Sequence, residues 1–267
     1  MLRPICLFLA IAFAPLPAMS ASTNWMEVEG GSLRLVTSGL SDEAGRLRGA
    51  VEIKLNPGWK TYWRNPGEAG IPPQIELKPS QLAVDAEIFF PAPQRISDPY
   101  AEWAGYPHPV TLPVIFTLSE PEAAGVLEGS IFLGICEMIC IPVEMPFSFD
   151  AGAYTFEPEH AAIVNAAFAG LPADARRGFQ LLSARRQGVQ VLFEVELPEG
   201  SAEPVLFVAP PDALQLSFTK LQGRRGDRAT FSADILHARE AAEITTKLDY
   251  TLVAGDEAVA GRIHLSP

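Results

Sequence analysis

The 267-residue chain carries 20 Lys and Arg against 32 Asp and Glu, which gives a formal net charge of −12. This balance argues against nucleic acid or an anionic membrane surface as a partner, because both require clustered cations. Hydrophobic residues make up 48% of the chain, and 24 Pro with 21 Gly indicate many turns and favour a mainly β protein. The length suits two domains of ordinary size.

The first 21 residues have the features of a secretory signal peptide. Arg3 makes the amino-terminal end of this segment positively charged. Residues 5–13 form an apolar run that is too short to span a bilayer. We expect cleavage near Ser20 or Ala21, and an exported protein in a compartment where disulfides persist. A retained membrane anchor is the alternative, and no later stretch is apolar enough for a transmembrane helix.

Short strands with turn signals between them follow in residues 22–155, the first expected domain. Apolar and charged residues alternate in 31–55, as in half-buried antiparallel strands. The remaining strands of this domain are predicted at 87–90, 110–118, 126–135 and 143–149. This spacing of strands is typical of a β-sandwich.

An aromatic segment interrupts these strands at residues 59–73, and its Gly and Pro content predicts an ordered loop. Two arrangements are open for its large side chains: a packed corner that anchors the loop, or an aromatic ligand platform with a cation–π contact. The side chains concerned are Trp59, Tyr62, Trp63 and Arg64. Composition favours the packed corner.

Residues 156–175 are predicted to link this domain to a second one. Pro158 at a first helical position and Gly170 with Pro172 after it predict a helix over 158–168. Strands then resume in the second domain, 176–267, which contains no cysteine. We expect them at 190–196, 205–209, 216–221, 229–235, 243–253 and 258–265.

Two cysteines, Cys136 and Cys140, lie beyond the expected signal peptide, which contains Cys6. A disulfide between them would close a loop of about five residues, worth only about 2 kcal/mol on the loop-entropy relation. A domain of about 130 residues builds its own core without this small gain. A structural disulfide is therefore a weak explanation of the pair, although exported domains do carry short-range disulfides.

Metal binding is a second explanation of the pair. Two thiolates near Met138 are soft ligands that suit Cu(I). Copper-delivering proteins of thioredoxin-like fold carry a similar pair at the start of a helix, but here Pro142 and Pro146 follow Cys140 and predict a strand. Zinc is less favoured, because a closed structural site needs four ligands and the chain has no second cysteine pair. We therefore predict neither a resident metal nor a cofactor, with copper(I) binding as the alternative.

A redox pair is the third explanation. Two close thiols convert readily between dithiol and disulfide, because the second thiol resolves any mixed disulfide that the first one forms. Opening so short a loop need not unfold the domain. The residues alone leave the three explanations open and favour the redox pair.

Three stretches of the chain form a recognisable pattern. They are residues 58–67, then Gly105-Tyr106 leading to 110–114, and 134–143 with both cysteines. Together they resemble the amino-terminal periplasmic domain of the transmembrane thiol–disulfide reductase DsbD, especially its ScsB-like relatives. The resemblance covers roughly residues 27–150, and the strand-rich remainder is similar to the second β domain of the ScsB-like proteins.

This resemblance implies an immunoglobulin-like β-sandwich in the periplasm whose cysteine pair shuttles electrons. Members of the family accept electrons through a membrane-embedded partner and a thioredoxin-like domain, and then reduce other periplasmic proteins. By the same analogy, Cys140 forms mixed disulfides and Cys136 resolves them. A cap loop shields the pair in the family; the matching region here is 98–108, where Trp103 or Tyr106 would lie over the sulfurs.

His108, between two prolines, is a further candidate in this region. It would approach the sulfurs as an acid–base group, or, as the alternative, lie exposed on a loop.

The chain contains neither the membrane domain nor the thioredoxin-like Cys-x-x-Cys module of full-length family members. We therefore expect a thiol–disulfide oxidoreductase that relays electrons and does not itself insert into the membrane. Its expected partners are a membrane-embedded thiol electron carrier, thioredoxin-like proteins and periplasmic protein substrates. The alternatives are a copper(I)-binding protein and a non-catalytic binding module with a structural disulfide.

Overall fold

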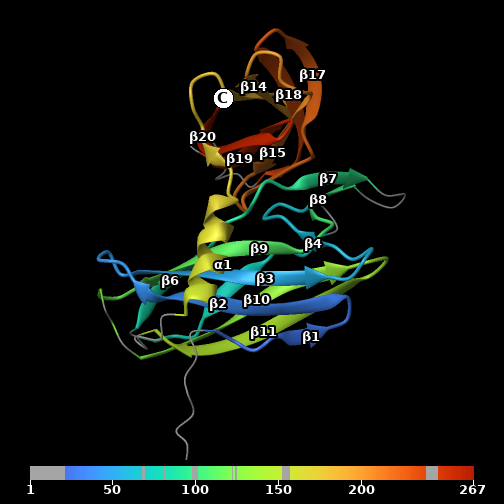
Figure 1. The fold of residues 1–267 in the computed structure, drawn as a ribbon. Helices are drawn as coiled ribbons and strands as arrows, with labels where there is room; N and C mark the ends of the chain where they lie inside the picture. Colours follow the sequence, from blue (N-terminus) through green and yellow to red (C-terminus); the bar gives the residue numbers. More distant parts are fainter. Residues whose placement is uncertain are drawn as a thin grey trace, which may run out of the picture.

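The computed structural model describes residues 22–67, 70–80, 82–97, 102–121, 123, 125–151, 157–238 and 246–267. The predicted signal peptide lies outside these residues. Figure 1 shows two bodies made of strands, with a helix along one side of the junction between them. None of the described helical structure is long and apolar enough to cross a membrane.

The amino-terminal sandwich consists of the strands β1–β11. One sheet has the order β1-β2-β3-β9-β6, with bounds Met26–Val28, Gly31–Ser41, Arg46–Leu55, Val110–Leu118 and Ala83–Ile88. The second sheet has the order β11-β10-β5, with bounds Cys140–Asp150, Val126–Cys136 and Gln74–Leu77. A third sheet, called the small sheet below, has the order β4-β8-β7, with bounds Thr61–Tyr62, Glu102–Tyr106 and Gln94–Ser97.

The core of the sandwich forms where the inward faces of the two larger sheets meet. On β11, alternate residues are buried, from Val143 to Phe149, while Glu144 and its outward neighbours are exposed. Phe116 of β9 lies 5.9 Å from Phe147 and 5.6 Å from Phe149, measured between ring centroids. Burying each such side chain contributes about 1.5–3 kcal/mol. The fold is mainly β and immunoglobulin-like, which confirms the expected fold class.

Helix α1, Pro158–Ala169, packs on the outer face of the sheet that contains β2, β3 and β9 (Figure 1). Proline at the start of the helix costs no hydrogen bond, because the first amide groups have no partner within the helix. Val164 and Ala167 are buried against Val36 and Ala50 of the sandwich. The predicted helix is thus present, and it ends one residue later than expected.

The carboxy-terminal body consists of the strands β12–β20. Seven of them follow the order β15-β19-β20-β13-β14-β18-β16, with β12 on β20 and β17 on β18. In chain order the bounds are Ala173–Asp174, Gln180–Gln187, Gln190–Glu196, Pro204–Ala209, Leu214–Leu216, Lys220–Arg225, Arg228–Ala238, Lys247–Ala254 and Glu257–Ser266. The body has its own buried core, which includes Phe179, Phe193 and Phe231. The proposed bounds of the two domains stay a prediction.

Several strands were not predicted from the sequence. They are β1, β5, β7, β8, β12 and β13, together with β4 inside the expected loop at 59–73. The strand predicted at 87–90 overlaps only the end of β6. In β13 a bulge between Leu181 and Ser183 breaks the alternation that identifies a strand. The strand predicted at 216–221 instead spans the end of β16 and the start of β17. Residues 243–245 of another predicted strand lie outside the described residues.

Candidate functional site

The two cysteines occupy the end of the hairpin formed by β10 and β11. The hairpin pairs in register from Val126↔Asp150 to Cys136↔Cys140, and three exposed residues, 137–139, connect the strands. A disulfide joins Cys136 to Cys140, whose Cα atoms lie 4.1 Å apart. The disulfide expected from the sequence is therefore confirmed, and it links two directly opposed residues of neighbouring strands.

Backbone pairing explains why these two residues come so close. Cys136 donates its N–H to Lys60 O and accepts a bond from Lys60 N–H, both at 2.9 Å. Its backbone polar groups therefore point away from Cys140. In an antiparallel ladder such a non-hydrogen-bonded pair is the narrow one, with Cα atoms about 4.5 Å apart. The strand pairing thus brings the two side chains together before any bond between the sulfurs forms.

The two cysteines differ strongly in exposure. Cys136 is 1% exposed, whereas Cys140 is an exposed residue at the start of β11. An incoming thiolate must reach the sulfur that it attacks, so access is one of the factors that decide which sulfur reacts. This geometry makes Cys140 the reachable member of the pair.

Tyr62 of β4 and Trp103 of β8 surround the buried side of the disulfide. The Tyr62 hydroxyl lies 3.1 Å from Cys140 Sγ, within hydrogen-bonding distance for sulfur. The rings of Tyr62 and Trp103 meet edge to face, 6.0 Å apart at an interplanar angle of 81°. Both side chains form one buried cluster with Cys136, and Ile96 of β7 packs against it. The small sheet therefore covers the disulfide on its protein side.

Close backbone approach fixes the small sheet in this place. A Cβ atom at Gly105 would lie 2.3 Å from Thr61 O, so only glycine lets β8 come so near to β4. Thr61, which is fully buried, donates its hydroxyl hydrogen to Gly134 O at 2.9 Å and so ties β4 to β10. A turn with Pro57 and a left-handed Gly58, φ +87°, leads the chain into β4.

The three residues predicted for the cap have different positions. Trp103 lies in the cluster with Cys136. Tyr106 is buried in the main core of the sandwich, where its hydroxyl donates to Pro91 O at 2.8 Å and burial raises its pKa well above the usual value. His108 is exposed between β8 and β9. Residues 98–101 of the predicted cap lie outside the described residues.

Tyr62 is the residue that sequence reasoning did not assign to the site. Its segment was interpreted as a packed corner, which is accurate for Trp63 with 2% exposure. The contact between Tyr62 and Cys140 joins residues 78 positions apart, and no local pattern predicts it. The sequence feature that could have assigned Tyr62 to the site is the stretch 58–67, one of the three that carry the family resemblance.

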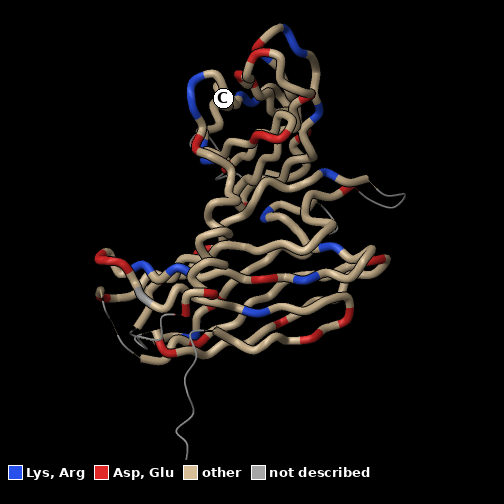
Figure 2. The backbone as a smooth tube through the Cα atoms, in the orientation of Figure 1, with Lys and Arg blue, Asp and Glu red and all other residues tan. Residues whose placement is uncertain are grey.

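The surface around the hairpin is poor in cations. Between Arg95 and Arg176 the sequence has no Lys or Arg, and the backbone in Figure 2 is coloured for acidic residues at several positions of the sandwich. Lys60 is the cation next to the disulfide. Its Nζ donates to Glu137 O at 3.2 Å and lies 4.8 Å from the centroid of the Trp103 ring. Among the residues that the structure describes, no group of three or more His, Cys, Asp and Glu is placed to hold a metal ion.

Residues 38–150 match the family model described as the amino-terminal part of the thiol:disulfide interchange protein DsbD. No curated protein matches the chain in sequence. The matched family is one of disulfide interchange, and the structure has a disulfide, Cys136–Cys140, within the matched residues.

Solved structures add information on the fold. The N-terminal periplasmic domain of ScsB from Proteus mirabilis aligns with a TM-score of 0.76 at 21% identity, over 92% of this chain and 99% of that chain. Tandem immunoglobulin domains of titin align with a TM-score of 0.20 at 11% identity, over 89% and 96% of the two chains. The C-terminal domain of the antigen I/II-family protein AspA from Streptococcus pyogenes gives 0.22 at 9%, over 93% and 99%. The last two scores are too low to carry an argument. Residues 38–150 thus match the DsbD amino-terminal family in sequence, and the described chain as a whole has the fold of the ScsB periplasmic domain.

Proposed function

We propose that the protein relays electrons in the periplasm through the Cys136/Cys140 pair, between a membrane-embedded reductase partner and periplasmic proteins. The observation that carries this proposal is the unequal exposure of the two cysteines in a disulfide at the end of a hairpin. Cys140 is exposed, while Cys136 is buried directly opposite it and within reach for the second step. Thioredoxin-like proteins are the proposed class of intermediary.

Reduction of the pair begins with attack on the exposed sulfur. A thiolate of the reduced partner attacks Cys140 Sγ, the bond between the two sulfurs breaks, and Cys136 leaves as a thiolate that takes up a proton. The second thiolate of the partner then attacks the partner's other sulfur, the one that is bonded to Cys140 in the mixed disulfide. This step releases Cys140 as a thiolate. Two electrons have passed to the pair, and the partner now holds the disulfide.

Delivery to a substrate runs through the same sulfur. The Cys140 thiolate attacks a substrate disulfide and forms a mixed disulfide, and one substrate thiol is released. The Cys136 thiolate then attacks Cys140 Sγ, which restores the original disulfide and releases the second substrate thiol. Cys136 is suited to this resolving role, because its strand position directly opposite Cys140 keeps the attacking distance short.

The experiment that tests these roles is the trapping of mixed disulfides. A Cys136→Ala variant keeps the exposed cysteine and lacks the resolving one. Its Cys140 thiolate should displace the leaving thiol from a single-cysteine thioredoxin probe activated as an aromatic mixed disulfide, and the resulting mixed disulfide between the two proteins should accumulate because neither has a second thiol to resolve it. A Cys140→Ala variant should accumulate much less. Trapping through the Cys140→Ala variant alone would reverse the assignment of roles. If the reduced protein instead binds Cu(I) tightly and exchanges no thiols, the copper alternative replaces the relay.

A further inference from the structure

The two faces of the small sheet lie against different parts of the molecule. Side chains alternate along a strand, so Ile96 points to one face of β7 and Arg95 to the other. Ile96 packs against the cluster of Tyr62, Trp103 and Cys136 beside the disulfide. Arg95 contacts the carboxy-terminal body, which Figure 1 shows next to β7. The small sheet therefore separates the redox site from the carboxy-terminal body.

Arg95 binds the carboxy-terminal body through both ends of its guanidinium group. Nη1 donates to Thr219 O at 2.6 Å, and Nη2 donates to Thr219 Oγ1 at 3.1 Å and to Leu206 O at 3.2 Å. The rings of Phe207 and Phe218 lie 5.5 and 5.1 Å from the Arg95 Cζ atom. Hydrogen bonds from a charged donor are stronger than neutral ones, so these bonds fix β7 relative to the body.

Strand β4 connects the disulfide to the same body. Tyr62 contacts Cys140, and each of the next three residues contacts the carboxy-terminal body. The contacts are the Trp63 ring with the Phe207 ring at 5.8 Å, Arg64 Nη1 with Asp249 Oδ2 at 3.3 Å, and Asn65 Nδ2 donating to Val208 O at 2.7 Å. The carboxy-terminal body thus contacts the small sheet at two places. One is Arg95 of β7, and the other is the segment that directly follows β4.

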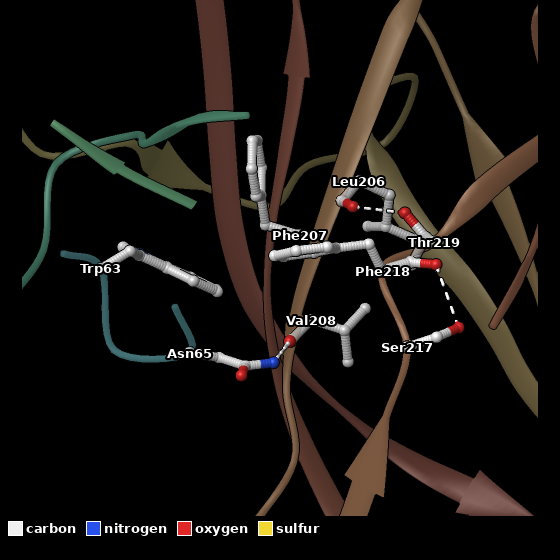
Figure 3. A pocket seen from close by; sticks show the side chains of 8 residues that line it. All are labelled: Trp63, Asn65, Leu206, Phe207, Val208, Ser217, Phe218 and Thr219. Atoms are coloured by element: carbon white, nitrogen blue, oxygen red, sulfur yellow. Dashed lines mark hydrogen bonds between the residues drawn. The ribbon is translucent and has the colours of Figure 1, made fainter. Parts of the chain in front are cut away.

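Figure 3 shows how closely the two bodies meet at this contact. Trp63 and Asn65 approach from the sandwich, and Phe207 and Phe218 face them from the carboxy-terminal body. The cavity left between them measures only about 10 Å³, close to the space that one water molecule occupies. Densely packed interiors have low compressibility, so a displacement of the body would move β4 with it.

We propose that the carboxy-terminal body holds the small sheet against the buried side of the disulfide and thereby limits the rate at which the disulfide is reduced. Arg95 is the positioning residue of this contact, because it fixes β7, which pairs with the strand that carries Trp103. The proposal rests on the proposed function of the cysteine pair as a redox centre. It assigns a role to a body that has no cysteine of its own.

Weakening the contact should uncover the side of the disulfide that Tyr62 and Trp103 cover, without unfolding either core. When β7 is no longer bound to the carboxy-terminal body, Trp103 and Tyr62 can move away from the disulfide by a local opening of the small sheet. By linkage, a contact that stabilises the closed sheet slows every reaction that requires the open one. The disulfide should therefore become more reactive as the contact between the bodies is weakened.

The test compares Arg95→Gln with Arg224→Gln in the full chain. Arg224 is a matched control, because it also donates to two backbone carbonyls, Ser201 O and Ala202 O, and both acceptors belong to its own carboxy-terminal body. Reduction of the disulfide by dithiothreitol is followed by thiol labelling, well below the unfolding temperature of each variant. We expect Arg95→Gln to speed reduction about fivefold or more, the lower end of typical coupling between sites.

The control Arg224→Gln should leave the reduction rate unchanged even if it lowers Tm, and Arg95→Lys should restore part of the slow rate. Hydrogen exchange of the β8 amides should rise in Arg95→Gln and stay unchanged in the control. Equal reduction rates in Arg95→Gln and the unmodified protein would overturn the proposal. If Arg95→Gln does not fold, Asn65→Ala removes the bond to Val208 O and is assessed by the same criteria.

These measurements need no protein partner, so they can refute the positioning role of Arg95 without refuting the proposed electron relay. Faster dithiothreitol reduction in Arg95→Gln, with no exchange between the unmodified protein and thioredoxin, would refute the relay and support the positioning role. Normal exchange of the unmodified protein with thioredoxin, with an unaltered rate of dithiothreitol reduction in Arg95→Gln, would support the relay and refute the positioning role.

Discussion

The amino-terminal sandwich and the carboxy-terminal body are both mainly β, and each has its own hydrophobic core. Each also contains a long antiparallel hairpin. In the sandwich, β10 and β11 end in Cys136 and Cys140, whereas in the body β19 and β20 meet at the turn Gly255-Asp256, which carries no thiol. The difference shows that a long hairpin does not by itself bring two sulfurs together. The sandwich hairpin adds two opposed cysteines, and the small sheet covers one of them.

The two halves also differ in charge. Residues 22–155 contain 8 Lys and Arg against 17 Asp and Glu, whereas residues 176–267 contain 11 against 12. The half that carries the disulfide is therefore strongly anionic and the other is almost neutral. Complementary charge steers partners during encounter, so a partner with a basic surface around its own cysteines is favoured.

The largest expected effect comes from Cys140→Ser, which removes the exposed sulfur. We expect it to abolish exchange with a thioredoxin probe, because Cys136 is buried and has no partner left. The lost disulfide should cost about 2 kcal/mol in the free energy of unfolding, since the loop it closes is short. Thiol labelling and denaturant unfolding measure both effects. Val189→Ser, at an exposed position in the carboxy-terminal body, is the control and should exchange normally.

Trp103→Ala should combine lower stability with a more reactive disulfide. Truncating a buried aromatic side chain typically costs about 3–5 kcal/mol in the free energy of unfolding. The matched variant Phe193→Ala in the core of the carboxy-terminal body should cost a similar amount. Only Trp103→Ala should speed reduction by dithiothreitol under conditions where both variants are folded. A similar acceleration in both would mean that stability, and not cover by Trp103, controls the rate.

The double substitution Met138→Ser with Ile139→Ser should separate protein partners from small thiols. These two side chains are 89% and 70% exposed and directly precede Cys140, so we expect a protein that docks at this cysteine to contact them. Losing exposed apolar anchors of an interface costs about 1–2 kcal/mol, which predicts roughly tenfold slower reduction by thioredoxin. Reduction by dithiothreitol should be unchanged. An equal loss with both reductants would show that the substitutions disturb the disulfide itself.

Tyr62→Phe should give the smallest effect of this series. It removes the hydroxyl 3.1 Å from Cys140 Sγ and keeps the ring that packs on Trp103. A hydrogen bond of this kind contributes about 0.5–1.5 kcal/mol, so exchange rates should change by up to roughly tenfold with little change in stability. Stopped-flow kinetics of exchange and thermal unfolding separate the two quantities. A large fall in Tm with unaltered kinetics would assign Tyr62 to structure alone.

The sequence predicted best what depends on local pattern. Short apolar runs with turn signals between them identified β10 and β11, and the prolines after Cys140 correctly excluded a helix. The longer strands β9 and β14 and the helix α1 followed from the same kind of signal. The cysteine pair was found from its spacing and from the resemblance of the flanking stretches.

The parts that were not predicted depend on contacts between distant residues. Strands β7 and β8 are four and five residues long, too short for alternation to identify them. The bonds of Arg95 reach residues 111 and 124 positions away, and only the packing of the two bodies creates them. Tyr106 illustrates the same limit. It pairs with Thr61, the neighbour of Tyr62, and yet its side chain is buried in the main core of the sandwich and not in the cluster beside the disulfide.

The most direct test of the whole account is a redox titration of the unmodified protein, followed by thiol labelling of Cys136 and Cys140. We expect one reversible two-electron transition within the range of glutathione and thioredoxin buffers, about −200 to −270 mV, and rapid electron exchange with thioredoxin. The folded structure should persist in both redox states. A disulfide that stays oxidised below about −300 mV, as structural disulfides in secreted proteins do, and whose removal only lowers Tm, would contradict the account.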